Sequence, residues 1–384
     1  MLISHLTLRN FRNHADSALA FGEGVNVLVG DNGQGKTNVL EAIAYLSLTK
    51  SFYATSDAVA VQFDAPGFEL QGRFLDGHGR EHHVRACYEA VTREKIFEVN
   101  RARPERLSSV IGEFPVVVLS PEHAPITAGG PSERRRFLDL ILSQVSRVYL
   151  EDVLEYRRVL RQRNRLLAEA RTAGTAVPAG IMEPWTLSLA RLGARVIERR
   201  RQFVEEFRPM VLATYRRIAP GAESPELRYV GTGGADGGES AERIEAGLLE
   251  ELRQRQDLER RRGMTMVGPH RDDLELCLNG RGVQAFASQG QHKTLLVALK
   301  VAECSYMRER TGENPLVLLD DLFGELDRNR SRTIIEVVDA LGQCVVTAVD
   351  EAVFRGAISW NDRHRKFEVE RGACRYAAAA GGGS

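Results

Sequence analysis

The sequence predicts an α/β fold that is divided by a large, mostly helical insertion. Two segments at opposite ends of the chain carry this prediction. Residues 30–37 match the glycine-rich pattern G-x-x-x-x-G-K-[ST] without a mismatch. Residues 316–321 form an apolar run that ends in two carboxylates, Asp320 and Asp321. Such elements normally belong to one continuous fold, so the 284 positions that separate residue 36 from residue 320 indicate an insertion.

Composition is that of a globular protein with two or three domains. The chain has 384 residues, of which 43% are hydrophobic and 27% charged. The 52 basic and 52 acidic residues cancel, so no global field draws the protein to nucleic acid. Five scattered cysteines without a Cys-x-x-Cys pair argue against zinc and are typical of a reducing compartment, so we expect a cytoplasmic protein. The sequence shows neither a signal-peptide core nor an apolar run of membrane-spanning length, so we expect no membrane contact.

Strand patterns surround the glycine-rich segment. Residues 2–8 and 25–29 predict strands, and residues 37–48 predict a helix with an apolar face. This strand–loop–helix order is the context that a phosphate loop requires, and the alternative is a chance glycine-rich turn. Residues 57–119 predict further strands in an antiparallel sheet, with runs at 59–61, 68–70, 83–88 and 116–119.

Helical patterns begin after Pro131. They cover residues 132–167, 184–215 and 241–260, and the glycine-rich segment 231–240 predicts a mobile loop. Strands at 265–267, 274–280, 316–319 and 344–347 follow, together with helices at 288–309 and 329–341. We therefore expect a discontinuous head of residues 1–120 and 263–376, an inserted lobe of residues 121–262, and a disordered tail of residues 377–384.

The glycine-rich loop predicts a phosphate site. Glycines let backbone N–H groups turn toward phosphates, and the following helix adds the positive end of its dipole. The Lys36 ammonium is expected to reach the β- and γ-phosphates, and the Thr37 hydroxyl to ligate Mg²⁺. ATP and Mg²⁺ are the expected cofactors. The predicted nucleotide-binding residues are Gly30, Asp31, Asn32, Gly33, Gln34, Gly35, Lys36 and Thr37.

The paired carboxylates predict the catalytic half of the same site. Asp320 is expected to hold the Mg²⁺ through water, and Asp321 to polarise the attacking water. With Lys36 they form the predicted catalytic set. The alternative is a strand-end turn with solvated acids.

Ser288-Gln289-Gly290-Gln291 predicts a second anion site. A serine hydroxyl, a glycine backbone and a helix N-terminus can together hold a phosphate, although an N-capped helix has the same pattern. The segment is similar in position to the signature of ABC-type ATPases, which in that class covers the γ-phosphate bound by a second molecule. Glu325 and Asp327 resemble the dimer-facing loop of that class, and Thr347 stands where many members have a histidine switch.

These residues together resemble the RecF family of bacterial recombination and gap-repair ATPases, short relatives of SMC-type heads. The resemblance covers nearly the whole chain. It rests on motifs at residues 8–13, 37–42, 120–122, 131–139, 161–164, 268–273, 286–291, 318–321 and 325–327. Two positions depart from the family pattern. Tyr53 replaces an arginine, and either stacks on adenine or packs in the core; His123 replaces an aspartate.

The resemblance implies an ABC/SMC-type ATPase head that dimerises on ATP and hydrolyses it slowly. It further implies binding to double-stranded and to gapped or single-stranded DNA, with RecR and RecO as partners in loading RecA. Arginine clusters on predicted helices are candidate phosphate contacts, or else solvated faces. The candidates are Arg134, Arg135, Arg161 and Arg163.

Three other functions remain open from the sequence. A transporter ATPase subunit normally has a much shorter separation between the two nucleotide motifs. A structural SMC-like head would carry a longer and less interrupted insertion. A small-molecule kinase would need an acceptor-binding lid and no Ser-Gln-Gly-Gln turn. DNA-stimulated, nucleotide-dependent dimerisation separates the RecF-like function from all three.

Overall fold

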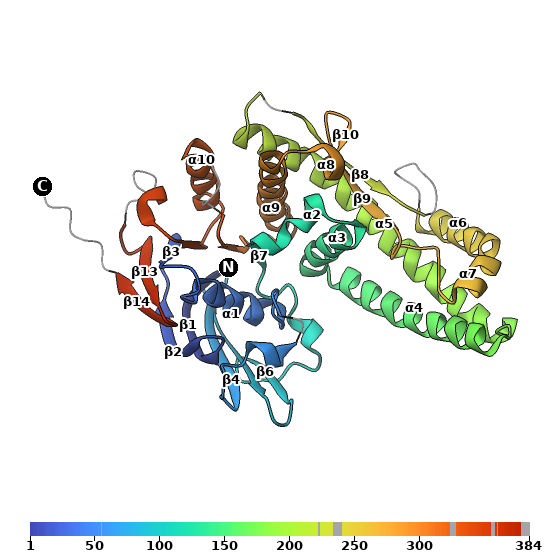
Figure 1. Ribbon diagram of the computed structural model, residues 1–384, viewed down its shortest axis with the longest axis horizontal. Helices are drawn as coiled ribbons and strands as arrows, with labels where there is room; N and C mark the ends of the chain where they lie inside the picture. The colour runs from blue at the N-terminus through green and yellow to red at the C-terminus, as the bar shows by residue number, and fades with distance from the viewer. Residues whose placement is uncertain are drawn as a thin grey trace, which may run out of the picture. The chain divides into compact units, whose positions relative to one another are not determined.

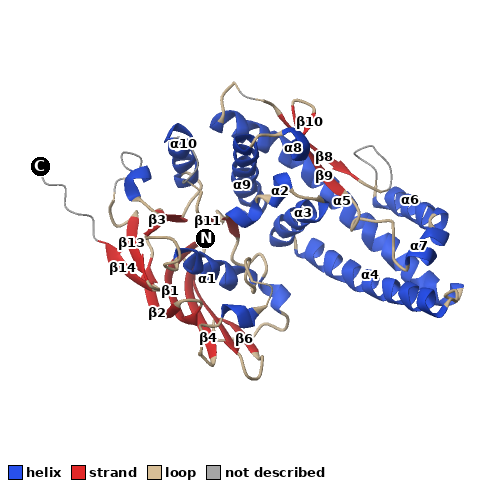
Figure 2. Ribbon diagram, in the orientation of Figure 1, coloured by secondary structure: helices blue, strands red, loops and turns tan. Residues whose placement is uncertain are grey.

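The computed structural model describes residues 1–54, 56–221, 223–232, 240–322, 328–354, 358 and 360–377. Contacts divide the chain into two compact units. Unit 1 contains residues 1–124, 214–222 and 293–384, and unit 2 contains residues 125–213 and 223–292. Strands dominate the N-terminal part of unit 1, whereas long helices dominate unit 2 (Figures 1 and 2). Residues 263–292 group with unit 2, although the sequence places them with the head, because their strand pairs with a strand of that unit.

Unit 1 is built on a six-stranded sheet. Its order is β14 (Ala373–Ala377), β13 (Arg365–Glu370), β3 (Val25–Val29), β12 (Cys344–Ala348), β11 (Leu316–Leu319) and β7 (Val116–Leu119). All pairs are parallel except β13 with β14. Strands β7, β11 and β12 are buried along their whole length, as expected for a parallel sheet covered on both faces. Residues 116–119 therefore join this sheet rather than the predicted antiparallel one.

The carboxyl ends of these parallel strands bring distant segments together. Strand β3 leads into the glycine-rich loop, β11 leads into Asp320, and β12 carries Thr347 near its end. The register pairs Leu319 with Val346, and Ala348 with Val29. Because β12 lies between β3 and β11, the two halves of the predicted site meet at one edge of the sheet.

A five-stranded antiparallel sheet completes the N-terminal part of unit 1. Its order is β2 (His14–Ala20), β1 (Leu2–Phe11), β4 (Gly67–Leu75), β5 (Glu81–Glu89) and β6 (Lys95–Val99). Alternate residues of β4 and β5 are buried, and α1 (Lys36–Leu48) packs on β1 and β4. The predicted strand at 59–61 is instead a 3₁₀ turn, η1 (Asp57–Ala60), with one bridge from Val61 to Phe11.

Two further helices, three further 3₁₀ turns and the C-terminal end of a helix that begins in unit 2 complete the described part of unit 1. Helix α9 (Gln289–Thr311), most of which lies in this unit, and α10 (Arg328–Asp339) match the predicted helices at 288–309 and 329–341. The 3₁₀ turns η2 (Leu107–Val110) and η3 (Pro121–His123) flank β7, and η5 (Glu351–Phe354) follows β12. Most of the predicted mobile loop, at residues 233–239, lies outside the described residues, as do residues 378–384 of the tail.

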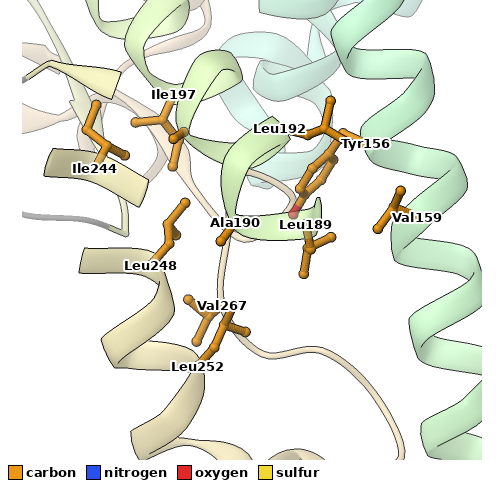
Figure 3. Packing of buried hydrophobic residues seen from close by; sticks show 11 residues of the cluster. Tyr156, Val159, Leu189, Ala190, Leu192, Ile197, Ile244, Leu248, Leu252 and Val267 are labelled. Carbon is orange, nitrogen blue, oxygen red and sulfur yellow. The ribbon is translucent and has the colours of Figure 1, made fainter. Parts of the chain in front are cut away.

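Unit 2 packs its helices around an apolar cluster (Figure 3). The cluster joins Tyr156 of α4 to Leu189 and Ile197 of α5 and to Leu248 of α6. The predicted helix 132–167 is two helices, because the Ser146 hydroxyl caps a new one by accepting from the Tyr149 N–H. The helices are α2 (Pro125–Ala128), α3 (Pro131–Val145), α4 (Arg147–Ala173), α5 (Ala179–Ile218), α6 (Ala241–Gln254), α7 (Gln256–Arg262) and α8 (Val283–Phe286).

A small sheet in unit 2 has the order β10 (Arg281–Gly282), β9 (Asp273–Leu278) and β8 (Pro225–Val230). The predicted helix 241–260 divides at Arg255 into α6 and α7. The predicted strand at 265–267 is an irregular segment. Hydrogen bonds from side chains, such as that from Arg200 to the Pro269 carbonyl, hold this segment instead.

Candidate nucleotide-binding site

The glycine-rich loop takes a backbone path that side chains would obstruct. Gly33 and Gly35 have positive φ values of 79° and 111°. A Cβ at Gly35 would lie 2.6 Å from Asn13 Oδ1 and 2.8 Å from His14 Nε2. The loop therefore needs glycine at this position to pass the β1–β2 turn and enter α1 at Lys36.

Lys36 lies within the curve of the loop. Its Nζ donates to the Gly30 carbonyl at 2.5 Å and to the Asp31 carbonyl at 2.7 Å. Burial lowers the pKa of Lys36, while the nearby charges of Asp320, Asp321 and Asp31 oppose that shift. An ammonium held by neutral carbonyls can exchange them for phosphate oxygens, which are stronger acceptors.

Asp320 is the centre of the site. Its carboxylate accepts hydrogen bonds from the Thr37 hydroxyl, at 2.8 Å to Oδ1 and 3.0 Å to Oδ2. These two side chains are 283 positions apart in the chain. Burial raises the pKa of Asp320, and the hydrogen bonds from Thr347, Thr37 and Tyr53 act against that rise. Within the described residues, the side chains that hydrogen-bond to this carboxylate are hydroxyl donors.

Thr347 braces both aspartates. Its hydroxyl donates to Asp320 Oδ1 at 2.8 Å and accepts from the Asp321 N–H at 2.9 Å. Asp321 has a positive φ of 48°, a backbone strain that is often found at functional sites. In this structure the hydroxyl proton of Thr347 points to Asp320, so its role is to position the carboxylates.

Tyr53 does not pack in the core, and its side chain lines the nucleotide pocket. Its side chain is 36% exposed, and its hydroxyl donates to Asp320 Oδ2 at 3.2 Å. The Tyr53 N–H donates to Ser51 Oγ at 2.9 Å, and that hydroxyl donates to Glu41 Oε1 at 2.5 Å. Arg12 is the last member of this series of hydrogen bonds, and its guanidinium makes a bidentate contact with the Glu41 carboxylate at 2.7 and 2.8 Å.

Sequence reasoning missed the residues that support the loop from behind. His14 is buried, with Nε2 3.0 Å from the Gly35 carbonyl and Nδ1 3.0 Å from Ser17 Oγ. Burial lowers the pKa of His14, so the ring is neutral at pH 7. Arg12, His14 and Glu41 lie in or next to the family motifs at 8–13 and 37–42, which was the only available signal.

These groups enclose a pocket of about 220 Å³. It is lined by Lys36 and Thr37 from α1, by Asp320 and Asp321 after β11, and by Thr347. The remaining lining residues are Asn32, Gly33, Gly35, Asn38, Tyr53, Pro121, Ala348 and Val349. The structure thus brings together Lys36, Thr37 and both aspartates, as the sequence predicted.

The donor set fits Mg²⁺. The Thr37 hydroxyl and the Asp320 carboxylate supply adjacent oxygen atoms, the ligand type that Mg²⁺ prefers. No group of three or more His, Cys, Asp or Glu side chains forms a metal cage within the described residues. A Mg²⁺ ion held by one or two protein oxygens, with water and phosphate as its other ligands, needs no such cage.

The Ser288–Gln291 turn lies in unit 2. Ser288 Oγ accepts from the Gln291 N–H at 3.3 Å, and Gln291 Oε1 accepts from the Ser288 N–H at 2.7 Å. This reciprocal pair caps the start of α9. Ser288, Gln289 and Gly290 are exposed, and the neighbouring Phe286 is 71% exposed.

Two further predictions concern the dimer-facing loop and His123. Glu325 and Asp327, the expected dimer-facing loop, lie outside the described residues. His123 caps its own turn, with Nδ1 accepting from the Ser120 N–H at 3.2 Å. Pro121 of that turn lines the nucleotide pocket.

Two of the four candidate DNA contacts are structural, which corrects that part of the prediction. Arg134 makes a bidentate contact with Asp273, at 2.8 Å for both hydrogen bonds. Arg163 pairs with Glu259 at 2.7 Å, and its side chain is only 3% exposed. Arg135 is half-buried and donates to the Asp272 carbonyl, whereas Arg161 is exposed on α4. Of these four arginines, Arg161 alone is exposed enough to meet a phosphate without giving up a buried contact.

Comparison with known proteins decides the family. A family model described as an AAA domain matches residues 5–113. The DNA replication and repair protein RecF of Salinibacter ruber is 42% identical over 375 residues, covering 97% of this chain and 91% of that protein. The chain belongs to the RecF family. RecF of Symbiobacterium thermophilum is 36% identical and covers 97% of both chains.

Solved structures confirm the predicted ABC/SMC-type head with its inserted helical part. The recombination mediator protein RecF of the RecFOR pathway, solved with ATPrS and with ATP, matches with a TM-score of 0.89 and 30% identity. The ATPrS structure covers 98% of both chains. An Smc head bound to the C-terminal winged-helix domain of ScpA matches with a TM-score of 0.56 at 15% identity, which shows a shared fold.

Helix composition bears on the membrane prediction. Within the described residues, no helix has the combination of length and apolar character that crossing a bilayer requires.

Proposed function

We propose that this RecF-family protein binds ATP with Mg²⁺ at the unit 1 pocket and hydrolyses it slowly as a conformational switch. The observation that carries this proposal is the convergence of Lys36, Thr37 and Asp320 at the carboxyl ends of β3 and β11. The backbone of residues 30–35 and Lys36 would hold the phosphates, and Thr37 and Asp320 would hold the metal, which supplies charge stabilisation to the transferring phosphoryl group. Asp321 would orient the attacking water.

We further propose that the pocket is completed by a second copy of the chain. The Ser288–Gln291 turn is exposed on unit 2, and its capped helix start offers N–H groups to an anion. The exposed Phe286 beside it would be buried in the dimer. Symmetry then supplies two equivalent sites, each with a phosphate loop from one copy and a Ser288 turn from its partner.

The expected biological role is recombinational and gap repair. Curated relatives are named DNA replication and repair proteins, and the similar solved structures are described as mediators of the RecFOR pathway. We propose binding to duplex DNA and to single-strand–duplex junctions, with RecR and RecO as partners in loading RecA. Arg161 is the exposed candidate for a phosphate contact on α4.

Nucleotide binding tests the proposal directly. Fluorescent ATP should bind the wild-type chain in the presence of Mg²⁺, and Lys36→Met should weaken that binding by at least about tenfold, because it removes a charge-assisted contact to phosphate. Lys50→Met is the matched control, since Lys50 is exposed and does not line the pocket.

Equal binding by Lys36→Met and the wild type would refute the assigned pocket. ATP binding without any stimulation of hydrolysis by gapped duplex DNA would instead favour an SMC-like structural head or an ABC-type subunit without a repair role.

A further inference from the structure

A second pocket, of about 280 Å³, lies wholly within unit 2. Its walls come from α4, the start of α5, α6 and α7, and none of its residues lines the nucleotide pocket. We propose that this pocket is a docking site for an acidic protein segment that carries a bulky apolar side chain. The proposal does not depend on the nucleotide chemistry.

One wall of the pocket is apolar and is already formed in the free protein. Leu167 and Leu252 are buried, and Met182, Leu187 and Leu249 extend the apolar surface toward the opening. Arg163 and Glu259 also line the pocket but neutralise each other at 2.7 Å. The other N–H groups of the Arg163 guanidinium donate to the hydroxyl oxygens of Thr186, at 3.2 Å, and Thr265, at 2.8 Å. The wall therefore offers apolar contact and no unpaired charge.

The rim of the pocket is positive. Arg171, Arg253 and Arg260 line it, against Glu183 as the one acidic residue besides the paired Glu259. Arg171 forms no ion pair within the described residues, and its Nη1 donates to the Arg262 carbonyl at 3.0 Å. A Cβ on Gly263 would lie 2.9 Å from Arg171 Nε, so the Gly263 backbone passes close to the guanidinium. Within the part of the chain that the structure describes, the carboxylate contacts of Arg253 and Arg260 are long, at 3.8 Å to Glu250 and 3.7 Å to Asp257.

This combination favours a protein segment over nucleic acid. A phosphate backbone gains little from an apolar wall, whereas a Leu or Phe side chain is stabilised by leaving water for such a wall. Carboxylates beside that side chain would pair with the rim arginines in the bidentate geometry that guanidinium favours. The α5 helix begins at Ala179, which lines the pocket, and adds its positive end. Ile181 and Leu187, each about half exposed near the start of α5, would continue the apolar contact.

Fluorescence anisotropy with the full chain tests the proposal. The probe is a fluorescein-labelled peptide of sequence Asp-Glu-Leu-Phe-Asp-Leu-Glu. We expect micromolar binding, weakened at least about tenfold by the double substitution Arg171→Glu with Arg253→Glu. Leu187→Ser should weaken it as well. Arg165→Glu is the matched control, because Arg165 is exposed on the same helix but outside the pocket. Thermal melting of each variant confirms that it is folded.

The comparison probes separate the outcomes. A peptide with serine in place of Leu and Phe, and one with Lys and Arg in place of the acids, should each bind at least about tenfold more weakly. Absence of binding by the acidic peptide up to millimolar concentration would overturn the proposal, as would equal binding by the rim variants and the control. Stronger binding of a short single-stranded oligonucleotide, lost in the rim variants, would assign the pocket to nucleic acid instead.

Discussion

At the scale of single residues, the site is organised around one carboxylate. Three hydroxyls, from Thr37, Tyr53 and Thr347, donate to Asp320. Hydroxyl donors hold an ionised carboxylate in place without neutralising its charge, so the charge remains available to a cation. A lysine or arginine in direct contact would have competed with the metal that we propose.

Tyr53→Phe tests this organisation. The substitution removes the donor to Asp320 Oδ2 and keeps the ring that packs on Phe52 at a centroid distance of 4.9 Å. We expect the Mg²⁺ concentration needed for half-maximal binding of fluorescent ATP to rise about threefold to tenfold, equivalent to one net hydrogen bond. Binding without Mg²⁺ should be unchanged. A Mg²⁺ requirement that stays at the wild-type value would show that Tyr53 only packs.

The sequence predicted the residues proposed to bind phosphate and metal, but not the hydrogen bonds that position them. Lys36, Thr37 and the aspartates have motif signals because phosphate chemistry demands those residue types at fixed spacing. Tyr53, Thr347 and His14 contribute single hydrogen bonds whose direction depends on the fold. Periodicity and spacing carry no information on such contacts, so the tyrosine could be placed only as a stacking or core ring.

At the scale of elements, the arginine clusters on the helices of unit 2 combine buried, ion-paired residues with exposed ones. Arg134, Arg163 and Arg200 are each buried in an ion pair, with Asp273, Glu259 and Asp139 respectively. Their neighbours in sequence, such as Arg161 and Arg199, are exposed. Because the helix repeat turns adjacent residues to different faces, a cluster in the sequence is not a cluster on the surface.

The substitutions Arg163→Met and Arg161→Met test whether the buried and the exposed arginine differ in their contribution to the free energy of unfolding. Loss of Arg163 leaves Glu259 buried without its partner, so we expect the free energy of unfolding to fall by about 3–5 kcal/mol. Arg161 is exposed, so its substitution should change stability by less than about 0.5 kcal/mol. Urea denaturation of both variants provides the comparison. A large loss for Arg161→Met, or none for Arg163→Met, would contradict the assigned roles.

Residues 265–272 are held by side chains rather than by sheet pairing. Arg200 donates to the Pro269 carbonyl at 2.8 Å, and Tyr229 donates to Asp272 Oδ2 at 2.6 Å. The Tyr156 hydroxyl lies 2.6 Å from His270 Nδ1, and His270 Nε2 lies 3.2 Å from the Thr265 carbonyl. The strand-like pattern at 265–267 was misleading because these tertiary hydrogen bonds replace a ladder.

His270 makes unit 2 sensitive to acid. Burial lowers the pKa of His270 to about 4 from 6.5. Between these values the unfolded chain binds a proton that the folded chain does not, so stability falls as pH falls. We expect the wild type to lose about 2 kcal/mol more than His270→Gln between about pH 7.5 and about pH 5 in urea denaturation. Parallel pH profiles for the two proteins would contradict the assignment.

At the scale of the whole molecule, the parallel order of β3, β12 and β11 explains why the nucleotide motifs can be so far apart in sequence. The strands place both motifs at one edge, whatever chain length intervenes between them. The sequence predicted the insertion and its helical character. The boundary near residue 292 could not be predicted, because residues 263–292 have strand and turn patterns that suit either unit and only their pairing decides.

In the proposed dimer, each nucleotide pocket is completed by the Ser288 turn of a partner copy. Mixing two inactive variants, Lys36→Met and Ser288→Arg, and measuring ATP hydrolysis tests it most directly. A mixed dimer would contain one doubly defective site and one intact site, so the mixture should recover up to about a quarter of the wild-type rate. Each variant alone should be inactive. A mixture as inactive as its components, while Ser288→Arg still binds ATP, would show that the site is not shared between two copies.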